Sequence, residues 1–484
     1  MNARLSLFSF AFLVPLGTLV CVAPADPAGD RMSAVVSGLS HPVEIVGRPP
    51  SRMTLDERLH RSGATAVSIA VVRAGRLDWA QGFGVLSEGS EASASSTTLF
   101  QAASISKPVT ALATLVLAEA GKLDLDTDVN DALTSWKVPE NEFTAASPVT
   151  IRGILSHSAG FTNGSVGSYA AGEAVPSLTD ALRGDAPSTE PPATVEYPPG
   201  SRTVYSGGGY SVLQQLLIDV TGTPFGQLMS DSVLAPIGMM DSYFAQPLRS
   251  ELEHRAAIGH DSSGQPIPGR WETLPEMAAG GLWSTAEDLA RMTIALHRAW
   301  VTEDGILSPE TTRMMMTPVL GSRGLGFETD RVGDRVRYFH TGSNRGYRAI
   351  IVGFPETGDA AVILANGDNA GELRYEILRS IARVYDWPGY EIMRKTVVVS
   401  DPKTYGEYVG VYDYGGGYTT TILLDDDRLY ARLTGGSPVE VFVEGPDRLF
   451  SLGGVEYAFT RESGAIHGLT ADLGDGSPIT ARRR

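Results

Sequence analysis

The residues of this 484-residue chain that are best suited to chemistry are Ser104 and Lys107, in the stretch FQAASISK. They lie three residues apart and precede the apolar run 109–118, which predicts a helix, and on a helix this spacing places both side chains on one face. A serine at a helix start lies near unpaired backbone N–H groups, which stabilise an oxyanion. A buried lysine one turn further on can accept the serine's proton. The pair predicts a nucleophile and its base within one turn.

Two further stretches carry reactive groups in a suggestive setting. Tyr205 lies on a glycine-rich turn before the apolar run 211–220, which predicts a helix, and such a turn can direct the hydroxyl into a cleft. The stretch 340–343, HTGS, precedes the strand-like run 349–354 and offers an imidazole, a hydroxyl and a backbone N–H at a strand edge. Taken singly, these stretches also fit a packing tyrosine and a turn between two strands.

His157, in the stretch LSHSAG, is a third candidate for proton transfer. A histidine between a predicted helix end and a glycine turn more often braces the chain by hydrogen bonding. We therefore expect His157 to hold the backbone rather than to act as a base.

The composition excludes several classes of function. A net charge of −17 argues against nucleic acid and against an anionic membrane surface as partners. The single cysteine, Cys21, permits neither a disulfide framework nor a cysteine zinc site, and the eight histidines show no metal-ligand spacing. We expect an enzyme without a metal or another cofactor. The sequence does not indicate the oligomeric state.

The N-terminus has the pattern of an export signal. Residues 1–25 contain Arg4, an uncharged apolar run and a small-residue ending, so we expect a signal peptide that is cut after Ala25, with an uncleaved anchor as the alternative. The protein is then periplasmic or extracellular. Residues 26–50 are rich in proline, glycine and serine, which predicts a linker.

Several local patterns predict the elements that must position these groups. The β-rich runs 66–72 and 77–85, joined by RAGR, predict a hairpin. Gly121 is the expected end of the helix that follows Lys107. Ser284, with Glu287 three residues later, predicts a capping box that opens a helix.

From residue 401 to residue 484 the chain changes character. Short β-rich runs, the first of them 405–412, alternate with Gly, Asp and Pro, which predicts a separate antiparallel barrel or sandwich. We find no chemistry in this region, whose task the sequence leaves open.

Taken together, the motifs resemble those of the penicillin-recognising serine hydrolases, in particular class C β-lactamases and D-alanyl-D-alanine carboxypeptidases. Ser104-Ile105-Ser106-Lys107 matches their Ser-x-x-Lys, Tyr205-Ser206-Gly207 stands in place of Tyr-x-Asn, and His340-Thr341-Gly342 stands in place of Lys-Thr-Gly. The resemblance spans about residues 54–385. It implies an α/β (α+β) fold of the β-lactamase/transpeptidase type over 51–390, an antiparallel sheet flanked by helices with a helical subdomain. Residues 401–484 resemble, more weakly, a lipocalin-like barrel.

The resemblance also implies roles for individual residues. Ser104 would form an acyl-enzyme, and Lys107 and Tyr205 would share the proton transfer, with the identity of the base left open. The backbone N–H groups of Ser104 and Ser343 would form the oxyanion hole. The implied substrate-binding residues are Gly207, His340, Thr341, Gly342, Ser343 and Asn344.

Two departures from the family pattern bear on the substrate. Gly207 replaces an asparagine whose amide touches the substrate, and His340 replaces a lysine that attracts a substrate carboxylate. We therefore expect an esterase or a D-peptidase ahead of a β-lactamase, acting on a small-molecule or peptide substrate such as one derived from the cell wall. The alternatives are a penicillin-binding protein that acylates but turns over poorly and a non-enzymatic peptidoglycan-binding protein. An α/β-hydrolase is disfavoured because the chain contains no Gly-x-Ser-x-Gly.

Overall fold

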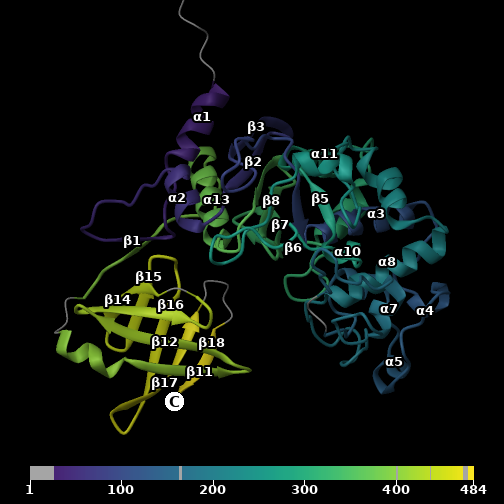
Figure 1. Ribbon diagram of the computed structural model, residues 1–484. Coiled ribbons are helices and arrows are strands. Elements are labelled where there is room, and N and C mark those ends of the chain that lie inside the picture. Colours follow the sequence, from purple (N-terminus) through teal and green to yellow (C-terminus); the bar gives the residue numbers. More distant parts are fainter. Residues whose placement is uncertain (1–26, 163–165, 399–401, 437, 473–477) are drawn as a thin grey trace, which may run out of the picture.

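The computed structural model describes residues 27–162, 166–398, 402–436, 438–472 and 478–484 (Figure 1). The expected signal peptide, 1–25, lies outside these residues.

A six-stranded antiparallel sheet forms the centre of the larger domain, with strand order β3-β2-β9-β8-β7-β6. The predicted hairpin is confirmed as its first two strands. The apolar run of β2 is buried on both faces because helices cover the sheet on each side. The strands are β2 (Ala66–Arg73), β3 (Arg76–Gly84), β6 (Glu328–Val332), β7 (Arg335–Asn344), β8 (Tyr347–Phe354) and β9 (Asp359–Ala365).

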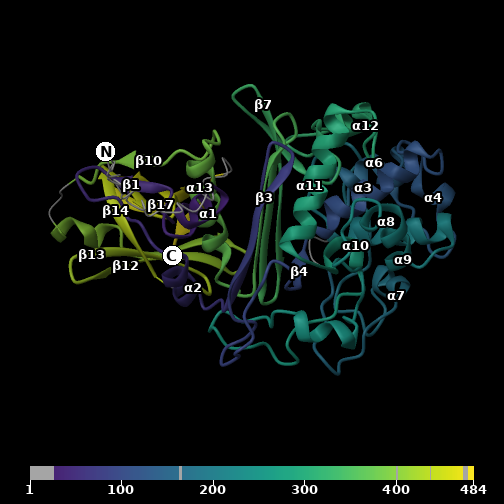
Figure 2. The same ribbon diagram turned by 90° about the horizontal axis from the view of Figure 1, so that it is seen from above.

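Two layers of helices enclose this sheet (Figure 2). One face packs against α1 (Pro27–Val36), α2 (Leu55–Ser62) and α13 (Gly371–Tyr385), and α11 (Ala286–Val301) packs against the other. Beyond α11 lies a helical subdomain around α3 (Ser106–Glu119) and α8 (Gly207–Thr221). The remaining helices are α4 (Val129–Ala132), α5 (Glu142–Ala146), α6 (Ile151–Leu155), α7 (Leu178–Arg183), α9 (Phe225–Met229), η1 (Ser230–Leu234), η2 (Ser250–Arg255), α10 (Met277–Gly280) and α12 (Pro309–Met316).

The two central helices of the subdomain begin and end where their sequences indicate. α3 is apolar and almost entirely buried, and it stops before Gly121, the predicted end of the helix, which adopts φ 69°. α8 begins at Gly207, where the Ser206 side chain accepts a hydrogen bond from the Gly209 N–H. Immediately before α3, the short strand β4 (Phe100–Ala103) pairs with β5 (Leu282–Ser284).

The predicted capping box at Ser284 is wrong by one residue. The side chain that caps α11 belongs to Thr285, which accepts from the Asp288 N–H at 3.0 Å. Ser284 is the last residue of β5, and its hydroxyl hydrogen-bonds to that of Ser242 at 2.8 Å. Ser284 and Thr285 both carry a hydroxyl group. Because Ser284 bonds to Ser242, Thr285 is the residue that caps the helix.

The segment 26–50, expected as a linker, contains a helix and a strand. Val35 of α1 is fully buried, and its carbonyl accepts a hydrogen bond from Ser380 Oγ of α13 at 2.7 Å. β1 (Val43–Ile45) pairs in parallel with β10 (Met393–Lys395). The composition of this segment does not indicate these elements, because its apolar residues are widely spaced among small polar ones. These apolar residues are nevertheless sufficient for packing on α13.

The C-terminal region is a closed barrel of eight antiparallel strands, which confirms the all-β prediction. The run 405–412 is only partly a strand, because residues Pro402–Glu407 form the 3₁₀ turn η3 and β11 starts at Gly410. The strands are β11 (Gly410–Gly415), β12 (Tyr418–Asp425), β13 (Arg428–Leu433), β14 (Val439–Gly445), β15 (Arg448–Ser451), β16 (Glu456–Glu462), β17 (Ala465–Asp472) and β18 (Ile479–Arg483).

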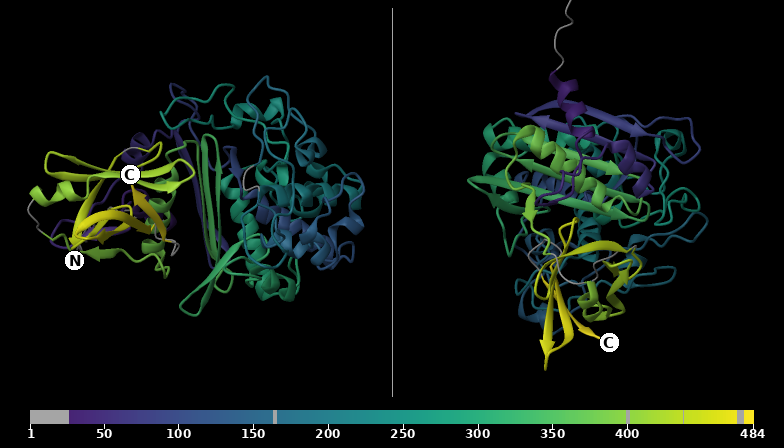
Figure 3. Two further views of the ribbon diagram at one scale, coloured as in Figure 1. Left: turned by 90° about the horizontal axis from the view of Figure 1, so that it is seen from below. Right: turned by 90° about the vertical axis from the view of Figure 1, so that its left-hand side faces the viewer.

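The barrel docks beside the α1/α13 layer, on the opposite side of the sheet from α3 and α8 (Figures 2 and 3). Phe442 and Phe450 of the barrel pack in one apolar cluster with Val43 and Ile45 of β1. Lys395 of β10 adds ion pairs to two barrel glutamates at 2.9 and 2.7 Å. The barrel is thus attached through the β1–β10 ribbon and away from the subdomain that carries Ser104.

Candidate active site

Ser104 lies in the tight turn between β4 and α3. The preceding residue, Ala103, has φ 51°, a left-handed conformation that costs free energy for a residue with a Cβ and that concentrates at functional sites. Ser106 secures this turn, because its hydroxyl donates to the Ala103 carbonyl at 2.6 Å and accepts from the Leu282 N–H at 3.0 Å. The strained turn presents Ser104, while the neighbouring serine is committed to structure.

Lys107 lies one turn beyond, directly against the nucleophile. Its Nζ is 3.1 Å from Ser104 Oγ and donates to the Ala279 carbonyl at 2.7 Å. The residue is 2% exposed, and the rings of Tyr205 and Tyr210 lie 4.8 and 5.7 Å from Nζ. A carbonyl and two aromatic faces stabilise an ammonium that has been removed from water. The predicted serine–lysine proximity is therefore present.

His157 accepts hydrogen bonds from the residues on both sides of Tyr205. The His157 carbonyl accepts from the Val204 N–H at 2.9 Å, and its Nδ1 accepts from the Ser206 N–H at 3.1 Å. The two rings lie 4.5 Å apart. Burial, followed by the charge of Lys107, lowers the pKa of His157 well below its usual value. His157 is a neutral brace for the tyrosine, which matches the bracing role expected from the sequence.

His340 on β7 is buried, and it is neutral as well. Burial, reinforced by the charge of Lys107, lowers the pKa of His340 to about 3. Its Nδ1 is 2.7 Å from the Thr341 carbonyl, so this nitrogen carries the proton. Its ring lies 6.2 Å from that of Tyr205, and its Nε2 is buried without a hydrogen-bond partner in the described part of the chain. β7 therefore presents a neutral imidazole acceptor to the site rather than a cation.

Gly342 allows β7 to lie directly against β4. A Cβ at this position would be 2.4 Å from the Ala102 carbonyl oxygen, so a side chain would force the two strands apart. β7 and β8 form a hairpin with Asn344 opposite Tyr347, and the pairing of β6 with β7 ends at Phe339. The alternation of an antiparallel ladder then directs the Ser343 N–H to the open edge of β7. This is the orientation that an oxyanion donor beside Ser104 requires.

The Asn344 side chain links β7 to two other elements of the site, β4 and α10. Its Nδ2 donates to Gln101 Oε1 of β4 at 2.7 Å and to the Gly280 carbonyl of α10 at 3.1 Å.

Strand alternation places the side chains of Thr341 and Ser343 on the opposite face of β7 from His340, Gly342 and Asn344. Gly207 is the first residue of α8 and has only backbone groups to offer. The binding roles of these residues remain predictions.

Glu276 is a buried acid that the sequence did not single out. It precedes α10, accepts from the Gly167 N–H at 2.6 Å and from Ser211 Oγ of α8 at 2.9 Å. Burial raises its pKa to about 7, and the charge of Lys107 opposes this shift. The Ala279 carbonyl was missed for a different reason, since backbone acceptors leave no mark in a sequence.

In the described residues no group of three or more His, Cys, Asp or Glu side chains is placed to hold a metal. Within the same residues there is no helix long and apolar enough to cross a membrane.

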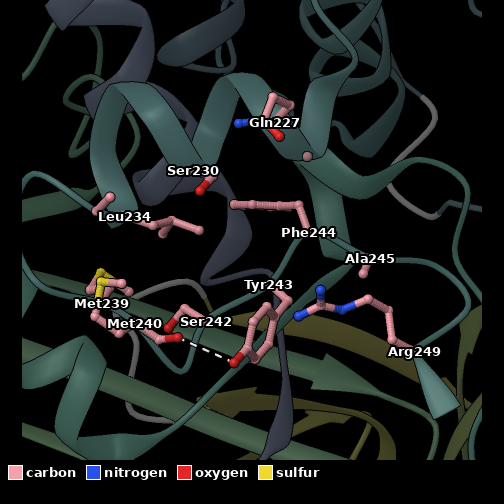
Figure 4. Close-up of a pocket in the computed structure, with 12 residues that line it drawn as sticks. Gln227, Ser230, Leu234, Met239, Met240, Ser242, Tyr243, Phe244, Ala245 and Arg249 are labelled. Atoms are coloured by element: carbon pink, nitrogen blue, oxygen red, sulfur yellow. Dashed lines mark hydrogen bonds between the residues drawn. The ribbon is translucent and has the colours of Figure 1, made fainter. Parts of the chain in front are cut away.

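A pocket of about 360 Å³ lies away from this centre, between α9, η1 and the segment 239–249 (Figure 4). Arg249 stacks on the ring of Tyr243 at 4.8 Å, and Tyr243 Oη donates to the Met240 carbonyl at 3.2 Å. None of the predicted site residues lines it.

Comparisons with known proteins agree with this arrangement. The family described as Beta-lactamase matches residues 52–386. Penicillin-binding protein 4 of Amycolatopsis lactamdurans is 28% identical over 324 residues, which cover 62% of this chain and 80% of the relative.

Two solved structures share the fold. The octameric penicillin-binding protein homologue from Pyrococcus abyssi has a TM-score of 0.59 at 22% identity and covers 88% of this chain and 98% of its own. The D-amino acid amidase from Ochrobactrum anthropi SV3 has a TM-score of 0.55 at 20% identity and covers 69% of this chain and 96% of its own. The family match over more than half of the chain, together with a serine and a lysine in contact, places this protein in the β-lactamase family of serine hydrolases.

Proposed function

We propose that the protein cleaves ester, amide or peptide bonds through an acyl-Ser104 intermediate, and that esters and D-amino-acid amides or peptides are better substrates than β-lactams. The observation that carries this proposal is the 3.1 Å contact between Ser104 Oγ and Lys107 Nζ beneath the ring of Tyr205.

Acylation begins when Ser104 Oγ attacks the substrate carbonyl carbon and its proton passes to the Lys107–Tyr205 pair. The backbone N–H groups of Ser104 and Ser343 stabilise the oxyanion, each donor contributing roughly 3–4 kcal/mol. The pair then delivers the proton to the leaving oxygen or nitrogen as its bond to carbon breaks. Deacylation repeats these steps with water as the nucleophile, releasing a carboxylic acid and restoring Ser104.

The preference against β-lactams follows from the two altered positions. A neutral His340 cannot attract a carboxylate by charge, and Gly207 supplies no side-chain amide for an acylamino group. Neither change interferes with attack on a neutral ester or amide. One structural neighbour is a D-amino acid amidase, and this supports the proposal of D-amino-acid amides as substrates.

We further propose that the protein acts outside the cytoplasm. The basic start, apolar run and small-residue ending of residues 1–25 support this proposal. Cell fractionation of the full chain and of a version lacking residues 2–25 tests it, because only the full chain should leave the cytoplasm.

The substrate class is tested with a panel of p-nitrophenyl esters, D- and L-amino-acid amides and nitrocefin, each followed by turnover and by intact-mass spectrometry. We expect turnover of the esters and D-amides that disappears in Ser104→Ala, with slower or no turnover of nitrocefin. A lasting adduct without turnover would indicate a penicillin-binding protein instead. Turnover that persists in Ser104→Ala would refute the proposal.

A further inference from the structure

Arg323 brings a positive charge to the catalytic centre from outside the family motifs. It lies in the loop between α12 and β6, and its guanidinium carbon is 5.5 Å from the centre of the Tyr205 ring. The charge of Arg323 also acts on His157, Tyr210 and His340, the groups around that ring. The charge that the neutral His340 does not supply is thus present on a neighbouring loop.

The position of Arg323 is built into the loop. Its backbone N–H donates to the Leu320 carbonyl at 3.2 Å, and its own carbonyl accepts from the Val319 N–H at 2.7 Å. Its Nη1 pairs with Glu328 Oε1 of β6 at 2.8 Å, and its side chain is 20% exposed. An arginine that is fixed at both its backbone and its guanidinium holds its charge at a defined place.

Tyr205 is therefore surrounded by two cations and two uncharged imidazoles. Lys107 Nζ lies 4.8 Å from its ring, and the rings of His157 and His340 lie 4.5 and 6.2 Å away. Tyr210 lies behind His157, with 5.3 Å between their rings. Besides Lys107, the charge of Arg323 acts on this cluster, and Arg323 pairs with Glu328 at the more exposed edge of the cluster.

We propose that Arg323 is a positioning residue for proton transfer, the second cation that favours the deprotonated Lys107–Tyr205 pair during acylation. This inference rests on the proposed acyl-Ser104 chemistry. Arg323 touches Tyr205 rather than the reacting atoms, and it acts by lowering the free energy of the pair after it has released a proton. Glu328 sets how much of that charge the tyrosine experiences.

The test measures the acylation rate of the full chain with a p-nitrophenyl ester between pH 5 and pH 9. Arg323→Gln should lower the rate on the order of tenfold at pH 7 and move the acidic limb of the profile to higher pH. Arg323→Lys, which keeps the charge, should recover most of the rate. The matched control is Arg331→Gln, which removes the same charge from an exposed position of β6 and should leave the profile unchanged.

Two further variants separate this role from a structural one. Glu328→Gln removes the neutralising partner, so the acidic limb should move the opposite way, to lower pH. In a Tyr205→Phe background Arg323→Gln should cause little additional loss, because it acts through the tyrosine.

The inference is overturned if Arg323→Gln lowers the rate without moving the limb, or if both variants move it in the same direction. It is also overturned if the loss lies in KM and only for substrates that bear a carboxylate, since Arg323 would then bind substrate. Failure of the proposed function would appear separately, as the absence of any acyl adduct on the unaltered protein.

Discussion

At the scale of the residue, Lys107 Nζ lies 3.1 Å from Ser104 Oγ and donates to the Ala279 carbonyl. Ser104 and Lys107 were identifiable because a three-residue spacing on a helix fixes their proximity. The Ala279 carbonyl and Arg323 were not, because the first is a backbone group and the second reaches Tyr205 only through the tertiary fold. Spacing along the chain therefore predicts contacts within one helix or strand, but not contacts with residues of distant elements.

The neutrality of His340 makes a prediction about stability and pH. Its folded pKa of about 3 lies below the ordinary value of 6.5, so between these values the unfolded chain binds a proton that the native chain does not. Stability should therefore fall as the pH drops below 6.5, by at most about 1.4 kcal/mol per pH unit from this group. His340→Gln should flatten the dependence of the free energy of unfolding on pH between 4 and 6.5, measured by urea titration of the full chain. Equal slopes for the native chain and His340→Gln would show that His340 titrates normally.

At the scale of the element, local patterns predicted some helices and strands, but not α1, α2 or α13, and not the edges and neighbours of the strands. The hairpin of β2 and β3 and the end of α3 before Gly121 follow from local patterns. The cap of α11 was misplaced because Ser284 and Thr285 differ only in their tertiary partners. That β7 has an open edge at Ser343 depends on where β6 ends, which only the sheet topology defines.

The packing of β7 on β4 gives a prediction for Gly342 and its neighbour. Gly342→Ala places a Cβ against the Ala102 carbonyl, so β7 must shift and carry the Ser343 N–H out of line. We expect kcat to fall on the order of 100-fold, the effect of losing one oxyanion donor. Ser343→Ala keeps the N–H and should retain activity within about twofold. Steady-state kinetics on one ester measures both, and similar losses in the two variants would contradict a backbone donor at residue 343.

At the scale of the molecule, the sequence predicted a separate β domain but not its attachment. The regular short strands identified the barrel, whereas the ribbon of β1 and β10 that holds it lies in the segment expected as a linker and in the chain leading to the barrel. Figure 2 shows the barrel beside α13, with the sheet between it and α3, the helix that follows Ser104. In this arrangement the barrel does not cover the catalytic centre.

This arrangement predicts that the barrel interface can be weakened without changing the chemistry. Phe450 is fully buried against β1, so Phe450→Ala should cost about 3–5 kcal/mol and lower the Tm. The acylation rate at 25 °C should be unchanged. Tyr418→Ala, at a position 70% exposed on the barrel, is the control and should change neither quantity. A rate that falls together with the Tm would show that the barrel supports the site.

The most direct measurement of the central claim is the location of the acyl group. The full chain is treated with an active-site serine probe, its intact mass is recorded, and the modified peptide is sequenced by mass spectrometry. We expect one adduct, on Ser104, which is absent in Ser104→Ala and retained in Ser343→Ala, with the same circular dichroism spectrum for all three. An adduct that persists in Ser104→Ala, or that maps to another serine, would contradict the account.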